Sequence, residues 1–128
     1  MPLVFLPAGP DHIPAMPHPI KVLFVCGRNR RRSPTAERIF RDDPRLSVRS
    51  AGTSDSSKRR ITESDLHWAD LILVMERKYA ARIRALFPDA AIPAMRSLDI
   101  PDEYEFMDGE LIDLLQSAVE HELEKSEG

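Results

Sequence analysis

The sequence predicts an α/β protein, a three-layer sandwich in which helices cover both faces of a four-stranded parallel sheet. Short apolar segments rich in β-branched residues alternate along the chain with segments whose apolar residues have helical spacing. The chain has 128 residues, of which 42 % are hydrophobic and 30 % charged, and this suits one globular domain with its own core. Parallel strands are joined by right-handed crossovers, and we expect the strand order 2-1-3-4.

Four segments have the composition of strands in such a sheet. The runs that begin at Ile20 and at Asp70 are apolar almost throughout, which is typical of parallel strands buried on both faces. A segment after Leu46 and a weaker one after Ile92 complete the sheet. The expected strands cover residues 20–25, 46–51, 70–75 and 92–98.

Helix start signals stand between these strands. Ser33 and Pro34 are the residue types favoured at a helix N-cap and at the first helical position, so a helix is expected there. Thr62, with Asp65 three residues later, has the pattern of a capping box and predicts a second helix. The other two expected helices cover residues 77–87 and 109–124, where apolar residues recur every three or four positions.

Residues 1–19 differ in composition from the rest of the chain. They hold six of the eleven prolines and no lysine or arginine, so we predict a proline-rich, partly disordered arm ahead of a domain at residues 20–128. Pro7 and Pro10 interrupt the apolar stretch that a secretory signal would need. The longest apolar runs are far short of a membrane span, and we expect a cytoplasmic protein without a membrane partner.

The composition excludes several classes of protein. A single cysteine, Cys26, excludes an internal disulfide and a cysteine-based zinc finger. None of the four histidines has a partner at ligand spacing, so we expect no metal site. The net charge of −3 does not favour nucleic-acid binding. Contact of the arginines between residues 28 and 32 with a nucleic-acid backbone is an alternative, although no aromatic residues are interleaved with them.

One loop carries the residues best placed for chemistry. Cys26 follows the first expected strand, and the loop after it leads into a helix N-terminus, where backbone N–H groups converge on an anion. A lone cysteine is most often a buried apolar residue. Here four arginines follow within six residues, and their field stabilises a nucleophilic thiolate. Arg32 can fold back over the loop, so that its planar guanidinium holds two oxygens of a phosphoryl group.

The residues of this loop and of the following strands resemble a known family. The similar segments are Val22–Cys26 with Asn29, Arg32–Glu37, Ser50–Thr53, Ala69–Met75 and Pro101–Tyr104. They are similar to the signature segments of the low-molecular-weight protein tyrosine phosphatases, and the resemblance covers about residues 20–124. It implies a phosphotyrosine protein phosphatase I-like fold and the hydrolysis of phosphomonoesters without a metal or organic cofactor.

The resemblance also implies a two-step reaction. Cys26 attacks phosphorus and forms a cysteinyl-phosphate, while Arg32 holds the phosphoryl oxygens. Asp102 donates a proton to the leaving oxygen and then accepts one from the hydrolytic water. Asp99 lies closer to the expected end of the fourth strand and is the rival for this role.

Further residues are expected to surround these three. Ser50 braces the loop, and Tyr104 and Phe106 either flank the pocket or pack beneath the last helix. The expected substrate-binding residues are Gly27, Arg28, Asn29, Arg30, Arg31 and Ser33.

Three departures from the family leave the substrate open. Arg28 precedes Asn29 where the family has a Gly-Asn pair, and Arg31 stands at the place of a second cysteine. The segment between Thr53 and Ile61 is shorter and contains no aromatic residue. We therefore expect a phosphorylated protein or a small phosphomonoester as substrate, phosphotyrosine first, and a monomer or weak dimer.

Two alternatives of different function share this fold. Thioredoxin-coupled arsenate reductases relay oxidation through further cysteines, which this chain lacks. A catalytically weak or inactive phosphoryl-binding module is the alternative that stays open.

Overall fold

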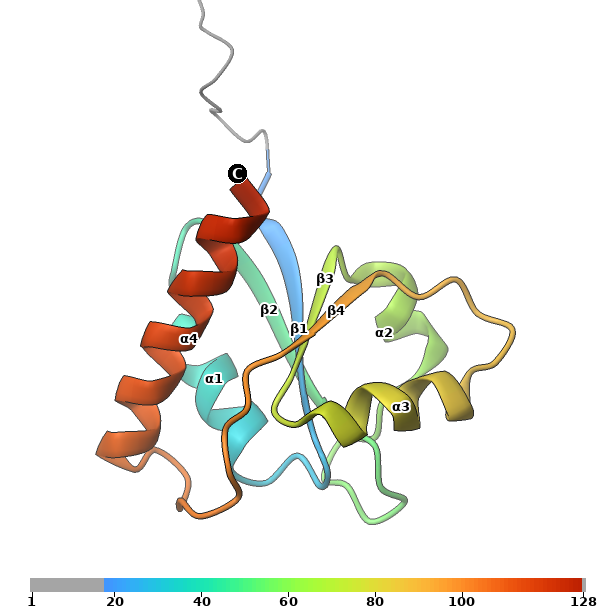
Figure 1. Ribbon diagram of the computed structural model, residues 1–128, viewed down its shortest axis with the longest axis horizontal. Coiled ribbons are helices and arrows are strands. Elements are labelled where there is room, and N and C mark those ends of the chain that lie inside the picture. The colour runs from blue at the N-terminus through green and yellow to red at the C-terminus, as the bar shows by residue number, and fades with distance from the viewer. Residues whose placement is uncertain (1–17, 128) are drawn as a thin grey trace, which may run out of the picture.

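The computed structural model describes residues 18–127, which form a four-stranded parallel sheet covered by helices (Figure 1). The strands are β1 (Ile20–Cys26), β2 (Leu46–Gly52), β3 (Leu71–Val74) and β4 (Ala94–Ser97). Their order is β2-β1-β3-β4, and each neighbouring pair is parallel. The predicted sheet and its strand order are confirmed. Most of the predicted proline-rich arm, residues 1–17, lies outside the described residues.

The helices of the described chain lie in two layers. They are α1 (Arg32–Phe40), α2 (Glu63–Trp68), α3 (Arg77–Leu86) and α4 (Gly109–Glu127). Helices α1 and α4 lie side by side on one face of the sheet, and α2 and α3 lie on the other (Figure 1). The predicted three-layer arrangement is therefore confirmed. Among residues 18–127, no helix combines the length and the apolar character needed to cross a membrane.

Strand β1 lies inside the sheet and is buried from Val22 to Cys26. Val22, Leu23, Phe24 and Val25 are fully buried, because β1 has a strand on each side and helices over both faces. This environment explains the unbroken apolar run in the sequence. Cys26 ends the strand opposite Gly52 of β2, and it therefore lies at the carboxyl edge of the sheet.

The start of α1 differs from the sequence prediction, whereas the start of α2 confirms it. The sequence predicts Ser33 as an N-cap, but α1 begins at Arg32, and its N-cap residue makes no side-chain capping bond. The Ser33 hydroxyl lies instead 2.9 Å from the Cys26 sulfur. The N-cap prediction is wrong because a tertiary contact competes with local capping for the same hydroxyl. At α2, Thr62 and Asp65 form the predicted capping box.

Asp65 is a buried carboxylate that ties α2 to β2 and to the segment after it. Its side chain is 1 % exposed and accepts hydrogen bonds from Arg59 at 2.5 Å, from Arg49 at 3.2 Å and from the Thr62 amide at 3.0 Å. Burial raises the pKa of Asp65, but the hydrogen bonds from Arg59 and Thr62 outweigh burial and leave this pKa below its ordinary value. The ionised carboxylate therefore stabilises the fold.

We expect Asp65→Asn to lower the free energy of unfolding by about 2–3 kcal/mol near neutral pH, because it removes the charge that two arginines share. The contribution of Asp65 is complete above the unfolded pKa of about 4 and is lost as the pH falls through the lower folded pKa. Urea unfolding of both proteins near neutral pH and at about pH 3 measures this, and the difference between them should shrink in acid. Asp89→Asn, at an exposed position between α3 and β4, is the matched control, with less than about 0.5 kcal/mol expected. A difference that persists undiminished in acid would contradict the electrostatic explanation.

Candidate active site

The loops that follow the strands meet at the carboxyl edge of the sheet, at the bottom of Figure 1. A cavity of about 650 Å³ lies at this edge, where ligands bind in open α/β sheets. The lining residues come from the β1–α1 loop, the segment after β2, helix α3 and the segment after β4. They are Cys26, Gly27, Arg28, Arg30, Arg31, Arg32, Thr53, Ser54, Asp55, Tyr79, Arg82 and Asp102.

Cys26 is buried in the wall of this cavity, and its sulfur has two polar neighbours. The side chain is 3 % exposed, and the sulfur lies 2.9 Å from the Ser33 hydroxyl. The backbone N–H of Asn29 donates to the same sulfur at 3.2 Å. Asn29 has a φ of 56°, a left-handed conformation that asparagine adopts more readily than most residues, and it turns the loop around the sulfur. The Asn29 amide and the Ser33 hydroxyl are therefore both placed to donate hydrogen bonds to the sulfur.

A chain of hydrogen bonds links Glu37 to the Ser33 hydroxyl. The Glu37 carboxylate accepts from Ser50 at 2.5 Å, and the Ser50 oxygen accepts from the Asn29 amide at 2.9 Å. The second amide hydrogen of Asn29 is donated to Ser33, also at 2.9 Å. Because an ionised carboxylate can only accept, Ser50 donates to Glu37, and the oxygens of Ser50 and Ser33 both accept from the Asn29 amide. The Ser33 hydrogen can then be donated to the Cys26 sulfur at 2.9 Å or to the Ala51 carbonyl at 3.4 Å. Ser50 thus lies behind the loop, in the position expected of a bracing residue.

The segment after β2 holds the cysteine loop from outside. The Ser54 amide donates to the Gly27 carbonyl at 2.8 Å, and the Lys58 amide donates to the Arg28 carbonyl at 2.9 Å. Gly52 allows this close approach, because a Cβ there would lie 2.8 Å from the Gly27 carbonyl oxygen. The short segment between Thr53 and Ile61 therefore orders the loop even though it has no aromatic residue.

Arg32 is buried at the start of α1, and its guanidinium has partners from two other segments, one after β3 and one after β4. It is 3 % exposed and donates through Nη1 to Glu76 at 2.5 Å and to the Ile100 carbonyl at 2.7 Å. Nη2 donates to the Tyr79 hydroxyl at 2.9 Å. Burial disfavours the charge, but the hydrogen bonds to Glu76 and Tyr79 outweigh it and raise the pKa of Arg32 above its ordinary value. The guanidinium is therefore a fixed cation with a defined orientation in the cavity wall.

Asp102 lines this cavity, whereas Asp99 does not. The Asp102 carboxylate lies 3.7 Å from Nε of Arg32, and its side chain is 60 % exposed. Asp99 lines a separate hollow with Glu76 and Pro101, and it accepts a hydrogen bond from Ser97 at 2.6 Å. Of the two rival carboxylates, Asp102 is the one that lies beside the cysteine loop.

The segment that carries Asp102 is anchored at both ends. The Ile100 amide donates to the Met75 carbonyl at 2.8 Å. The Met107 amide donates to the Thr35 hydroxyl at 2.9 Å, which ties the segment to α1. Asp102 therefore has an exposed side chain on a backbone that is held near the cavity.

The other expected site residues lie in three positions. Gly27, Arg28, Arg30 and Arg31 line the cavity, and Asn29, Ser33 and Ser50 are buried behind it. Tyr104 and Phe106 do not line the cavity in this structure. The Tyr104 hydroxyl lies 3.2 Å from Glu110, and Phe106 is 50 % exposed.

Sequence reasoning missed the contribution of the third helix. Tyr79 and Arg82 line the cavity from α3, and Glu76 just before this helix holds Arg32. The sequence places Tyr79 only in the apolar stripe of a helix. The topology contains the missing signal, because a helix that follows a parallel strand begins at the carboxyl edge of the sheet. Tyr79 is an aromatic residue of the cavity lining, and it is 9 % exposed.

The donors around the cavity suit an anion. Among residues 18–127, no group of three or more His, Cys, Asp or Glu side chains is placed to hold a metal ion. Backbone N–H groups, a buried guanidinium and exposed arginines are instead the groups that bind phosphate oxygens.

Comparison with known proteins adds two findings. Residues 21–65 match the family model of the low molecular weight phosphotyrosine protein phosphatases, a segment that runs from β1 through the cysteine loop into α2. A search of curated protein sequences finds no significant match.

Solved structures share the fold over most of the chain. The low molecular weight protein tyrosine phosphatase SP-PTP from Streptococcus pyogenes has a TM-score of 0.69 at 20 % identity, over 83 % of this chain and 92 % of its own. The tyrosine phosphatase Wzb from Escherichia coli K30, in complex with phosphate, has a TM-score of 0.64 at 24 % identity, over 82 % and 96 %. The YwlE arginine phosphatase from Geobacillus stearothermophilus has a TM-score of 0.60 at 22 % identity, over 85 % and 97 %.

The matched segment and the fold together support a phosphatase. The chain has the fold of the low-molecular-weight phosphatases, and the predicted resemblance to that family is confirmed. At identities of 20–24 %, the likeness of this chain to these structures is one of fold.

Proposed function

We propose that this chain is a cysteine-dependent phosphomonoester hydrolase that acts on phosphotyrosine in proteins. The observation that carries the proposal is the position of the Cys26 sulfur. It lies in the wall of an anion-binding cavity, accepts a hydrogen bond from the Asn29 amide, lies within hydrogen-bond distance of Ser33, and shares that cavity with the buried Arg32 guanidinium.

The first step is the transfer of the phosphoryl group to sulfur. The Cys26 thiolate attacks phosphorus, and the bond from phosphorus to the ester oxygen breaks. Arg32 and the loop amides stabilise the charge on the equatorial oxygens. Asp102 gives its proton to the leaving oxygen, which departs as an alcohol or a phenol.

The second step hydrolyses the cysteinyl-phosphate. Asp102, now ionised, accepts a proton from a water molecule that attacks phosphorus, and the sulfur leaves as a thiolate. The Ser33 hydroxyl, 2.9 Å from the sulfur, stabilises the departing charge. Phosphate is released, and Asp102 is again protonated for the next turnover.

The wall of the cavity supports an aromatic phosphoester as substrate. Tyr79 places a ring beside Arg32, and the guanidinium carbon lies 5.6 Å from the centre of that ring. A phosphotyrosyl ring that enters this cavity has an aromatic surface to pack against. We further propose that residues 20–128 are the catalytic domain of a cytoplasmic protein that acts as a monomer or weak dimer.

Hydrolysis of p-nitrophenyl phosphate in EDTA with a reducing agent tests the chemistry. We expect turnover by the parent protein and a loss of at least about 10⁴-fold in kcat for Cys26→Ser. Circular dichroism of both proteins controls for folding. Equal turnover by the two proteins would exclude Cys26 as the nucleophile. No turnover by the folded parent would favour the phosphoryl-binding module.

A further inference from the structure

The residues that line the cavity carry more positive than negative charge. Five of the lining residues are arginines, and two are aspartates. Both aspartates have cationic neighbours: Asp55 pairs with Arg60 at 2.9 Å, and Asp102 lies 3.7 Å from Arg32. Neither carboxylate is therefore available to neutralise the remaining arginines.

Three of the lining arginines have no carboxylate partner within the described part of the chain. Among the ion pairs of residues 18–127, none includes Arg28, Arg30 or Arg82. Arg30 donates to the Ser56 carbonyl at 3.3 Å, which is an uncharged partner. All three residues are exposed, so their charges face solvent around the cavity and not the core.

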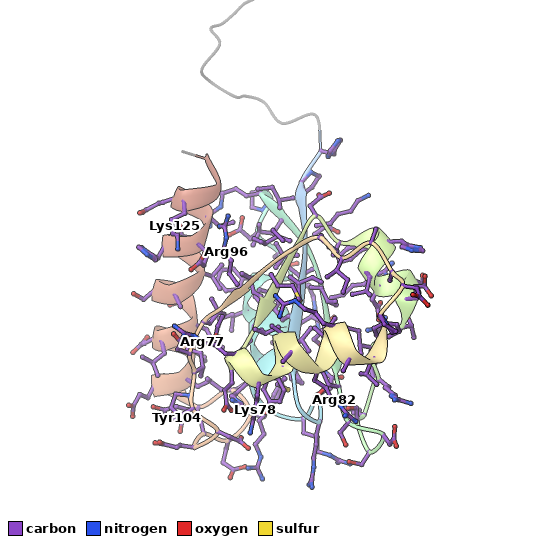
Figure 2. The ribbon with its side chains drawn as sticks, turned by 45° about the vertical axis from the view of Figure 1, so that its right-hand side comes forward. Arg77, Lys78, Arg82, Arg96, Tyr104 and Lys125 are labelled. Atoms are coloured by element: carbon purple, nitrogen blue, oxygen red, sulfur yellow. The ribbon has the colours of Figure 1, made fainter. Side chains whose placement is uncertain are left out.

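These three residues, Arg28, Arg30 and Arg82, form what we call the basic rim, and the rim faces the cavity from two elements. Arg28 and Arg30 belong to the loop between β1 and α1, and Arg82 lies on α3, one turn after Tyr79. Figure 2 shows Arg82 and Lys78 below α3, on the side of the loops that meet at the carboxyl edge. The charges of the rim therefore add up over the cavity mouth.

The side chains of the rim are not among the groups that the phosphoryl chemistry needs. The phosphoryl group itself is held by the loop amides and by Arg32, which is buried. Exposed like charges that have no partners repel one another and do not stabilise the fold. They attract anions, and at the mouth of a cavity they contact the part of a substrate that remains outside it.

We propose that the basic rim selects phosphotyrosyl peptides in which acidic residues flank the phosphorylated residue. This inference rests on the proposed function and names the substrate class of the same site. The same rim disfavours a phosphoester or phosphoramidate whose carrier group is cationic, because like charges meet at the mouth.

Two phosphotyrosyl peptides that differ only in their flanks test the proposal. One carries Asp and Glu on both sides of phosphotyrosine, and the other carries Asn and Gln at the same positions. At about 50 mM salt we expect kcat/KM for the acidic peptide to be about tenfold higher or more, and at about 0.5 M salt the ratio should fall below about threefold. Equal values for the two peptides at low salt would overturn the proposal.

Variants assign the selectivity to the rim. The double variant Arg28→Gln with Arg82→Gln should reduce the acidic-to-neutral ratio below about threefold at low salt. Arg84→Gln is the matched control, because Arg84 is exposed on the same helix and does not line the cavity. A ratio that the double variant leaves at the parental value would overturn the role of the rim.

Two further measurements separate this proposal from the chemistry and from a small-molecule substrate. If the parent does not hydrolyse p-nitrophenyl phosphate, the hydrolase proposal fails, and binding of the same two peptides, followed by fluorescence anisotropy, tests the rim by itself. Tighter binding of the acidic peptide supports the rim, and equal affinity contradicts it. If a sugar bisphosphate is hydrolysed with a higher kcat/KM than the acidic peptide, the preferred substrate is a small polyanion, and the proposal is overturned.

Discussion

Arg32→Lys lowers kcat for p-nitrophenyl phosphate by an expected factor of about 10²–10³, although the substitution keeps the positive charge. A lysine offers a single ammonium group where the guanidinium offers a planar set of donors. In the parent, Nη1 is held by Glu76 and by the Ile100 carbonyl, and Nη2 is held by Tyr79. This arrangement fixes the plane of the guanidinium, which a flexible ammonium cannot reproduce. A single ammonium group cannot hold Glu76, Tyr79 and the Ile100 carbonyl together.

Steady-state kinetics of Arg32→Lys should be compared with those of Arg38→Lys. Arg38 is an exposed residue of the same helix and does not line the cavity, so its substitution should change kcat by less than about threefold. Urea unfolding of both variants shows whether the loss at Arg32 reflects the site or the stability of the domain. Near-parental turnover by a folded Arg32→Lys protein would overturn the assignment of Arg32 as the phosphate clamp.

Asp102→Asn should slow the hydrolysis of phenyl phosphate by about 10²-fold or more, and that of p-nitrophenyl phosphate by less than about tenfold. The reason is the leaving group: p-nitrophenolate leaves readily without a proton, whereas phenolate needs one. Asp102 lies in the cavity wall 3.7 Å from Arg32, on a segment anchored at Ile100 and Met107. An amide at this position can occupy the same space but cannot donate an acidic proton.

Asp99→Asn is the matched control for this prediction. Asp99 lies three residues earlier in the same segment, but it faces a different hollow and accepts a hydrogen bond from Ser97. Its substitution should slow both substrates equally, and by less than about threefold. A leaving-group dependence in Asp99→Asn, together with none in Asp102→Asn, would show that the acid is Asp99.

The rim charges and the catalytic groups give different kinetic signatures. Loss of a rim arginine changes the discrimination between peptides and its salt dependence, because an exposed charge acts at a distance through solvent. Loss of Arg32 should lower turnover for every substrate, because we propose that its buried charge holds the phosphoryl group in the cavity that it shares with Cys26. Measuring both quantities on the same variants separates selection of the substrate from its conversion.

The cysteine loop is the part of the site that local sequence predicts best. Cys26 follows an apolar strand, Asn29 lies in the turn, and Arg32 begins the helix, so strand, loop and helix place all three within seven consecutive residues. Such short-range order depends on burial of the strand and on the geometry of a strand–loop–helix unit, and both can be seen in the pattern of residues. The parallel sheet followed from the alternation of strands and helices in the same way.

Sequence alone determined the fold class and the loop that holds the sulfur, because apolar periodicity and loop composition are local properties of the chain. The tertiary structure decided which distant groups complete the site. Arg32 is held by residues 44, 47 and 68 positions away, namely Glu76, Tyr79 and Ile100. Those partners meet only because three parallel strands end at one edge of the sheet, and the exact lengths of the intervening loops set which side chain reaches the cavity. Ser33 is a second example. Its hydroxyl lies 2.9 Å from the Cys26 sulfur and does not cap the helix, because the folded loop places the sulfur within its reach.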